Sequence, residues 1–296
     1  MMQSGQELLE ASIVALMFAL GLRTEPQPRG DRPERALLVR ALFARDVFVP
    51  LFAMSLLSIV GVPRQAIVGA TLLAISPGIP IVLQHELYHG RNAALIFRTS
   101  AVEGLLSIAS TPLWLAIVSR LFVDDAAIMP FAAGRLVALL FLVPFGAGMV
   151  MRRLAPRAML RASTPIMLVA DLLLLIASIV LLTGVLPSIP RLGAGYAAAI
   201  VGITAFALLV GDVAAGSHVR DRRTVSLLCA ARHPGLALLI AQSNFTGELA
   251  LPAVIVGMIL GTLLTMPFAI WRVRPRTSID TVELADRPLL APRANR

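Results

Sequence analysis

Apolar stretches long enough to cross a lipid bilayer recur from end to end of this 296-residue chain. About 20 apolar residues span the hydrocarbon core as an α-helix, and in lipid only helices and closed barrels satisfy every backbone hydrogen bond. The short alternating segments of a β-barrel are not found in the sequence. With 57% hydrophobic and 15% charged residues, the chain is unlike soluble domains. We therefore expect an all-α polytopic membrane protein.

Nine transmembrane helices are expected, and two of them contain helix-breaking residues at mid-membrane depth. Their approximate limits are 8–22, 36–60, 63–83, 92–119, 131–151, 164–182, 193–213, 224–243 and 249–271. The third span is interrupted at Pro77-Gly78 and the eighth at Pro234-Gly235. Backbone groups freed in lipid must be satisfied by protein or trapped water, so such breaks belong inside a bundle or beside a cavity. A matched pair of breaks points to a transporter's substrate site.

The arginines predict the topology. All 26 basic residues are arginine, and with the N-terminus outside most of them fall in cytoplasmic segments at 23–35, 91, 152–161, 220–223 and in the tail. This alternation predicts a cytoplasmic C-terminus. We expect an integral protein of the bacterial inner (plasma) membrane. Because the net charge of +9 lies in short loops that set topology, we expect no nucleic-acid partner.

The positions of the breaks also predict an internal repeat. We divide the chain into an extracytoplasmic end (1–7), a four-span repeat (8–120), a connecting loop (121–130), a five-span repeat (131–272) and a disordered cytoplasmic tail (273–296). An odd offset separates the third from the eighth span, so the two repeats have opposite orientations. Inverted repeats with discontinuous helices are common in secondary transporters.

Short motifs at both breaks resemble the bile acid:sodium symporter family. Residues 76–78 (Ser-Pro-Gly) and 91–95 resemble the family's C-P-G-G and the G-N-x-A-L that follows it, and residues 232–241 resemble its Q-N-x-G-L-A region. Residues 17–22 resemble the M-F-x-M-G-L of an early helix. The resemblance, which covers about residues 8 to 272, implies a core domain with two crossing broken helices and a panel domain against which it moves.

The resemblance fails at the family's sodium-binding positions. Val82 and Leu83 match a Ser-Asn pair, Leu228 matches a glutamate, and Arg45 and Arg232 match two glutamines. A hard cation needs oxygen ligands, which apolar side chains do not supply, and a guanidinium repels it. These mismatches therefore argue against sodium coupling by the family mechanism. One hypothesis is that a guanidinium permanently mimics the ion.

Ionisable residues inside the spans predict a buried charge network, because such residues usually face a bundle interior or a cavity. To this network or to an ion-coupling site we assign Arg45, Asp46, Arg98, Ser100, Glu103 and Arg232. Arg98 and Glu103 are five residues apart, which turns them about 140° from each other on a helix. We expect Glu103 to contact Arg232 or Arg45 instead. The alternative is a purely structural salt-bridge network that replaces a lost ion site.

The predicted substrate site consists of Pro77, Gly78, Arg232, His233, Pro234 and Gly235. A half-helix N-terminus carries about half a positive charge and free amides, which suit a carboxylate or a sulfonate. The alternative hypothesis for His233 is that it caps the half-helix without a role in binding. The segment 85–89 has His-x-x-x-His spacing, but we interpret it as a polar helix end, and we expect no metal site and no cofactor.

These features favour a secondary transporter that moves a small organic anion across the membrane by alternating access, and not an enzyme. Proton coupling through Glu103 or His233, exchange and uniport remain open as driving mechanisms. One alternative is a sodium-dependent symporter that uses altered ligands such as Ser100 and Glu103. Another is a non-transporting membrane scaffold or sensor on the same fold. The expected partners are therefore the anion, H⁺ or Na⁺, and the lipid bilayer, with the oligomeric state open.

Overall fold

A computed structural model describes residues 2–23, 32–76, 93–122, 135, 138–217, 221–245 and 249–271. Within these ranges every regular element is helical, as the sequence predicts. Six stretches there are long and apolar enough to cross a membrane, at 5–23, 35–60, 98–122, 156–215, 222–242 and 250–269. The stretch 156–215 contains two successive long helices. The count of nine spans and the division into two repeats therefore stay predictions.

The described helices overlap the predicted spans, although α9 begins eight residues before the start predicted at 164 and residues 77–83 of the third span lie outside the described residues. The second predicted span consists of α2 (Arg32–Phe43), the π-helical turn η1 (Ala44–Phe48) and α3 (Val49–Val60). The other elements are α1 (Met2–Arg23), α4 (Arg64–Ala74), α6 (Ala93–Phe122), η2 (Ala138–Leu142), α8 (Val143–Leu154), α9 (Pro156–Val185), η3 (Leu186–Leu192), α10 (Gly193–Ala215), α11 (Arg222–Ala230), α12 (Pro234–Asn244) and α13 (Ala250–Trp271). The predicted tail and most of the predicted loop 121–130 lie outside the described residues.

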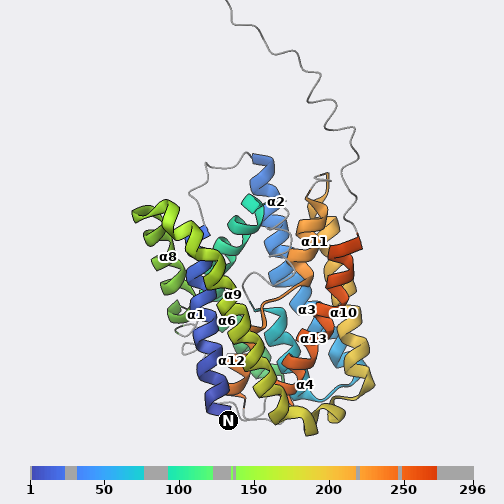
Figure 1. Cartoon of the computed structure of the whole chain (residues 1–296). Coiled ribbons are helices and arrows are strands. Elements are labelled where there is room, and N and C mark those ends of the chain that lie inside the picture. The colour runs from blue at the N-terminus through green and yellow to red at the C-terminus, as the bar shows by residue number, and fades with distance from the viewer. Residues whose placement is uncertain are drawn as a thin grey trace, which may run out of the picture.

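The long helices form two groups that stand side by side (Figure 1). In the first group α1 runs along α8 and α9, and in the second group α3, α4, α10, α11 and α13 pack together. Glycines bring α1 and α8 into backbone contact. A Cβ added at Gly21 would lie 2.2 Å from the carbonyl oxygen of Phe145, and one added at Gly148 would lie 2.2 Å from that of Phe18. The division into a panel and a core domain stays a prediction.

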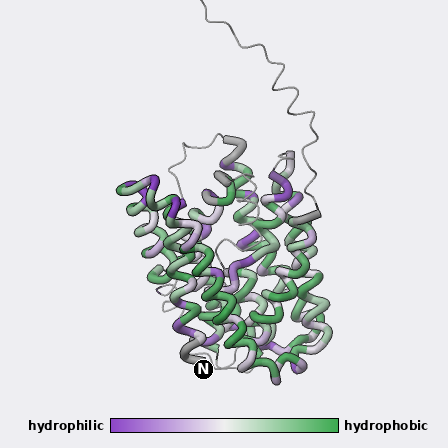
Figure 2. Tube along the Cα trace, in the orientation of Figure 1, coloured by the Kyte–Doolittle hydropathy of each residue, from purple (hydrophilic) through white to green (hydrophobic). Residues whose placement is uncertain are grey.

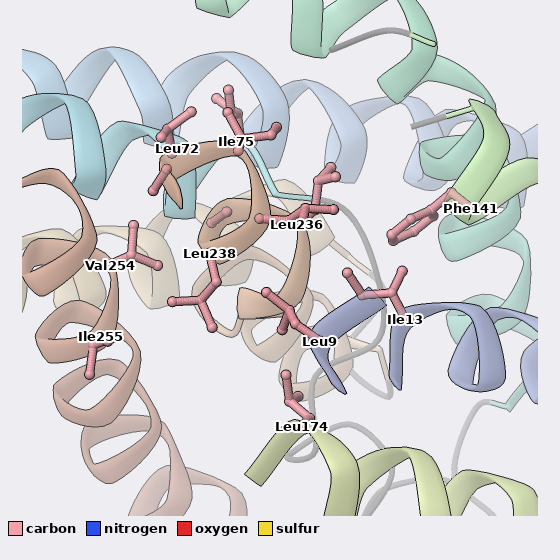
Figure 3. Packing of buried hydrophobic residues seen from close by; sticks show 14 of the residues in the cluster. Leu9, Ile13, Leu72, Ile75, Phe141, Leu174, Leu236, Leu238, Val254 and Ile255 are labelled. Carbon is pink, nitrogen blue, oxygen red and sulfur yellow. The ribbon is translucent and has the colours of Figure 1, made fainter. Parts of the chain in front are cut away.

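An apolar core around α12 joins the two groups. Leu9 and Ile13 of α1 face Leu236 of α12, and Val254 and Ile255 of α13 lie on the other side of the same half-helix (Figure 3). All five side chains are buried. Because α12 contacts both α1 and α13, this half-helix lies between the groups.

The described ends of the chain lie at opposite ends of the bundle (Figure 1), since α1 starts at one end and α13 finishes at the other. This is the placement that the predicted odd number of spans requires. Hydrophilic segments gather where α8 meets α9 and where α11 begins, and a further group lies at mid-height inside the bundle (Figure 2). The first of these places includes Arg152 and Arg153 in the last turn of α8. Which end faces the cytoplasm stays a prediction.

Candidate functional site

The eighth predicted span is interrupted at the expected position. Helix α11 ends at Ala230, residues 231–233 are not helical, and α12 begins at Pro234. Proline disfavours the helical conformation of the residue before it, and His233 accordingly has φ −86° and ψ 118°. The Gly235 backbone N–H donates a hydrogen bond of 3.3 Å to Nδ1 of His233. The capping role considered for His233 is thus confirmed.

The end of α4 reaches this interruption. Ser76 donates a hydrogen bond of 2.7 Å from its Oγ to the carbonyl oxygen of His233, and both residues are buried. Pro77 and Gly78, which belong to the predicted site, lie outside the described residues. Among the described residues, the hydrogen bond of Ser76 is therefore the contact that joins the end of α4 to the break before α12. No role was predicted for Ser76 from the sequence, although its place beside Pro77 was a usable signal.

Arg45 forms the centre of a buried charge cluster next to the break. Its Nη2 lies 2.5 Å from Oε1 of Glu103 on α6, and the two side chains are 1% and 3% exposed. Its guanidinium also donates to the carbonyl oxygens of Leu228, at 2.8 Å, and Ser76, at 3.4 Å. Oδ1 of Asp46 lies 3.9 Å from its Nε. Of the two partners expected for Glu103, the structure shows Arg45.

Arg232 joins the cluster through the backbone of Arg45. The π-helical turn makes this possible, because the Val49 N–H bonds the carbonyl of Ala44 instead of that of Arg45. The carbonyl oxygen of Arg45 accepts a hydrogen bond of 2.7 Å from Nη2 of Arg232. Nη1 of Arg232 lies 3.9 Å from Oδ1 of Asp46. The cluster thus combines two guanidinium groups with two carboxylates, and its formal charges cancel.

A proline frees the next carbonyl of the same turn. Pro50 has no N–H to donate to the carbonyl of Asp46, four residues earlier. That oxygen accepts a hydrogen bond of 3.0 Å from the indole Nε1 of Trp114 on α6. The π-helical turn therefore accepts hydrogen bonds from α6, through Trp114, and from the link between α11 and α12, through Arg232.

Two predicted members of the network are not part of these contacts. Ser100 lines a separate cavity of about 20 Å³ between α1, α6 and the η2–α8 segment. Arg98 lies on α6, half-buried, five residues before Glu103. The structure brings together Arg45, Asp46, Glu103 and Arg232. In the described ranges no group of His, Cys, Asp and Glu side chains could hold a metal ion, and segment 85–89 lies outside them.

A cavity of about 330 Å³ lies between the two helix groups, beside the break. Helix α9 forms one wall, and α3, α4, α10, α13 and the link between α11 and α12 form the others. Three residues of the predicted substrate site line it, namely Arg232, His233 and Pro234. The other polar lining residues are Asp171, Ser178, Thr204, Thr262 and Thr265. The volume is that of a small-molecule site.

Three lining side chains carry buried polar atoms without a hydrogen-bond partner among the described residues. They are Nε2 of His233, Nε of Arg232 and Oγ of Ser178, the last of these on the opposite wall. His233 is 1% exposed and the Arg232 side chain 5%. Buried polar groups are hydrogen-bonded in the great majority of cases. These unused polar atoms in the cavity wall are available to a ligand.

The α9 wall of the cavity is absent from the predicted site. Asp171 could be recognised only as an intramembrane carboxylate, a feature that marks functional positions without naming a partner. Ser178 carries no signal in the sequence, because serine is frequent at the helix–helix interfaces of membrane proteins.

Comparison with known protein families gives a match over the N-terminal and middle parts of the chain. Residues 12–188, more than half of the chain, match the model of the sodium bile acid symporter family. The matched segment includes Arg45, Glu103 and the α9 wall of the cavity, whereas Arg232 and His233 lie beyond it. No curated protein matches the chain.

Proposed function

The chain belongs to the sodium bile acid symporter family, and from this premise we propose that it moves a small organic anion across the membrane by alternating access. Members of this family are membrane transporters and not enzymes. The observation that carries the proposal is the cavity between the two helix groups, with Arg232 and His233 in its wall. Alternating access requires a binding site between two bodies that rock against each other, and the cavity has this position.

The wall at the break is the place for the anionic group of the substrate. Arg232 supplies a positive charge whose Nε has no hydrogen-bond partner, and His233 supplies an unused ring nitrogen. Helix α12 begins at Pro234 in the same wall, and a helix N-terminus attracts anions. Asp171 on α9 also lines the cavity. The positive groups at the break favour an orientation of the substrate with its anionic group towards the break.

The rest of the cavity favours an apolar substrate body. Most of the lining side chains are aliphatic, as in typical small-molecule sites. Leu174 is buried, whereas Leu175 and Leu263 are exposed at the rim. Away from the break the polar lining groups are the carboxyl of Asp171 and the hydroxyl groups of Ser178, Thr204, Thr262 and Thr265. A monocarboxylate or monosulfonate with an apolar body therefore fits the site best.

Ligand-dependent thermal stabilisation, followed by uptake into proteoliposomes, tests the proposal. A panel of monocarboxylates and monosulfonates, with cholate among them, is added to the purified protein. A true ligand at 100 times its Kd should stabilise the protein by about 2.7 kcal/mol. Compounds that stabilise the protein are then assayed for uptake, where we expect saturable accumulation.

Two variants locate the site. Arg232→Gln should raise the ligand concentration needed for a given stabilisation by about tenfold or more. The reason is that it removes a charge-assisted hydrogen bond to the ligand, of roughly 1.5–3 kcal/mol. The control Arg222→Gln removes the same charge from an exposed side chain paired with Asp212, so its response should be unchanged. Ser178→Ala, which breaks no hydrogen bond in the described structure, tests the opposite wall without unfolding the protein. A panel that neither stabilises the protein nor enters vesicles would contradict the proposal and favour a non-transporting scaffold.

A further inference from the structure

Oxygen atoms from separate elements converge on the guanidinium of Arg45. They are the carboxylate of Glu103 on α6, the carbonyl of Leu228 on α11 and the carbonyl of Ser76 after α4, at 2.5, 2.8 and 3.4 Å. The carboxylate of Asp46 lies 3.9 Å away. We infer that Arg45 is a covalently attached cation that fills a monovalent-cation site, and that removing its side chain opens this site to a soluble cation.

One of these oxygens belongs to the end of a helix. Leu228 lies in the last turn of α11, where a carbonyl has no partner within its own helix and carries the negative end of the helix dipole. Ser76 follows the end of α4 by two residues and adds a carbonyl from outside the helix. Together with the buried carboxylate of Glu103 they create a negative site away from water. Such a site is stable only when a cation occupies it.

The guanidinium suits this site because its donors are rigid and its charge is permanent. Arg45 is among the largest fully buried side chains of the described structure. Its planar group presents five N–H donors in a fixed fork, which lets it bind several oxygens at once. Carbonyl and carboxylate oxygens are also the ligands that hard metal cations take. The same oxygens can therefore serve a tethered or a soluble cation.

An attached cation cannot leave the protein during a transport cycle. If the chain transports an anion as proposed above, the cycle then needs no Na⁺ at this site. Only this last step rests on the proposed function. The occupancy of the site by Arg45 is tested by protein stability alone. A failure of this inference can therefore be distinguished from a failure of the proposed transport function.

Thermal unfolding of the purified full-length protein at constant ionic strength provides the test. The wild-type protein should melt at the same temperature in sodium, lithium and choline chloride. Arg45→Gly should lower Tm, and guanidinium at about 10 mM, far below denaturing concentrations, should restore it in a saturable manner. Choline at the same concentration should not. The control Arg222→Gly, which removes a 42% exposed side chain at the first residue of α11, should show no selective response to guanidinium.

A second variant separates a specific site from general weakening of the fold. Arg45→Gly combined with Glu103→Gln removes both charges of the pair, so no buried carboxylate is left uncompensated. This protein should be more stable than Arg45→Gly alone, and guanidinium should stabilise it less. Sodium-selective stabilisation of the wild-type protein would overturn the inference. Equal responses of the single and the double variant to guanidinium would overturn it as well.

Discussion

The close contact of α1 with α8 predicts a large difference between two glycine substitutions in one helix. A Cβ at Gly148 would lie 2.2 Å from the carbonyl oxygen of Phe18 and 2.9 Å from Cα of Gly21, both backbone atoms of α1. A Cβ at Gly146, two residues earlier, would meet nothing within 4 Å. Gly148→Ala must therefore push the helices apart, and Gly146→Ala provides its matched control.

The expected magnitude follows from two opposing terms. Ordinary Cβ contacts begin at 3.4 Å, so α1 and α8 would have to separate locally by about 1 Å. Overpacking of this kind costs roughly 1–3 kcal/mol. Alanine gains about 1 kcal/mol over glycine in a helix, and both variants share this gain. The difference between the two variants therefore isolates the clash, at roughly 1–3 kcal/mol.

Thermal unfolding in a mild detergent measures this difference. Each kcal/mol corresponds to about 2–4 °C in Tm for a chain of 150–250 residues. We expect Gly148→Ala to melt several degrees below Gly146→Ala, and Gly21→Ala to behave like Gly148→Ala because it meets the carbonyl of Phe145 at 2.2 Å. Equal melting temperatures for the residue 146 and 148 variants would refute the backbone contact between α1 and α8.

Two further substitutions test the break and the π-helical turn. Ser76→Ala should destabilise the protein by about 1–3 kcal/mol, because it leaves the buried carbonyl of His233 without its donor. Ser58→Ala, whose hydroxyl bonds a carbonyl of its own helix, should cost less in the same unfolding assay, and equal costs would argue against contact between the two breaks. Pro50→Ala should change the emission of Trp114, because the new N–H competes with the indole for the carbonyl one turn earlier. The measurement needs a background without the second tryptophan of the chain, and unchanged emission would contradict the role assigned to the proline.

Features with a local cause could be predicted from the sequence. Proline at position 234 restricts the residue before it, so the end of α11 and the start of α12 were predictable from sterics alone. Hydropathy gave the limits of α13, expected at 249–271 and observed at Ala250–Trp271. The partner of Glu103 could be narrowed to two arginines, because few intramembrane groups can compensate a buried carboxylate.

Features that depend on distant residues could not be predicted. The π-helical turn has a partial signal in Pro50, yet its extra residue becomes favourable only where Arg232 and Trp114 supply donors to the freed carbonyls. The carbonyl of Leu228 gives no sequence signal, because every residue has one. The α9 wall of the cavity depends on how the two helix groups pack, which no local pattern encodes.

The cap of α12 fixes the tautomer of a ring in the cavity wall. Since Nδ1 of His233 accepts the Gly235 amide proton, the neutral imidazole must carry its own hydrogen on Nε2. The nitrogen left over for a ligand is therefore a donor, which pairs with acceptor oxygens and rejects ammonium groups. A second proton on this ring could bind only at Nδ1, where it would displace the amide and loosen the first turn of α12. Any proton relay through His233 would thus be mechanically coupled to the half-helix that separates the two groups.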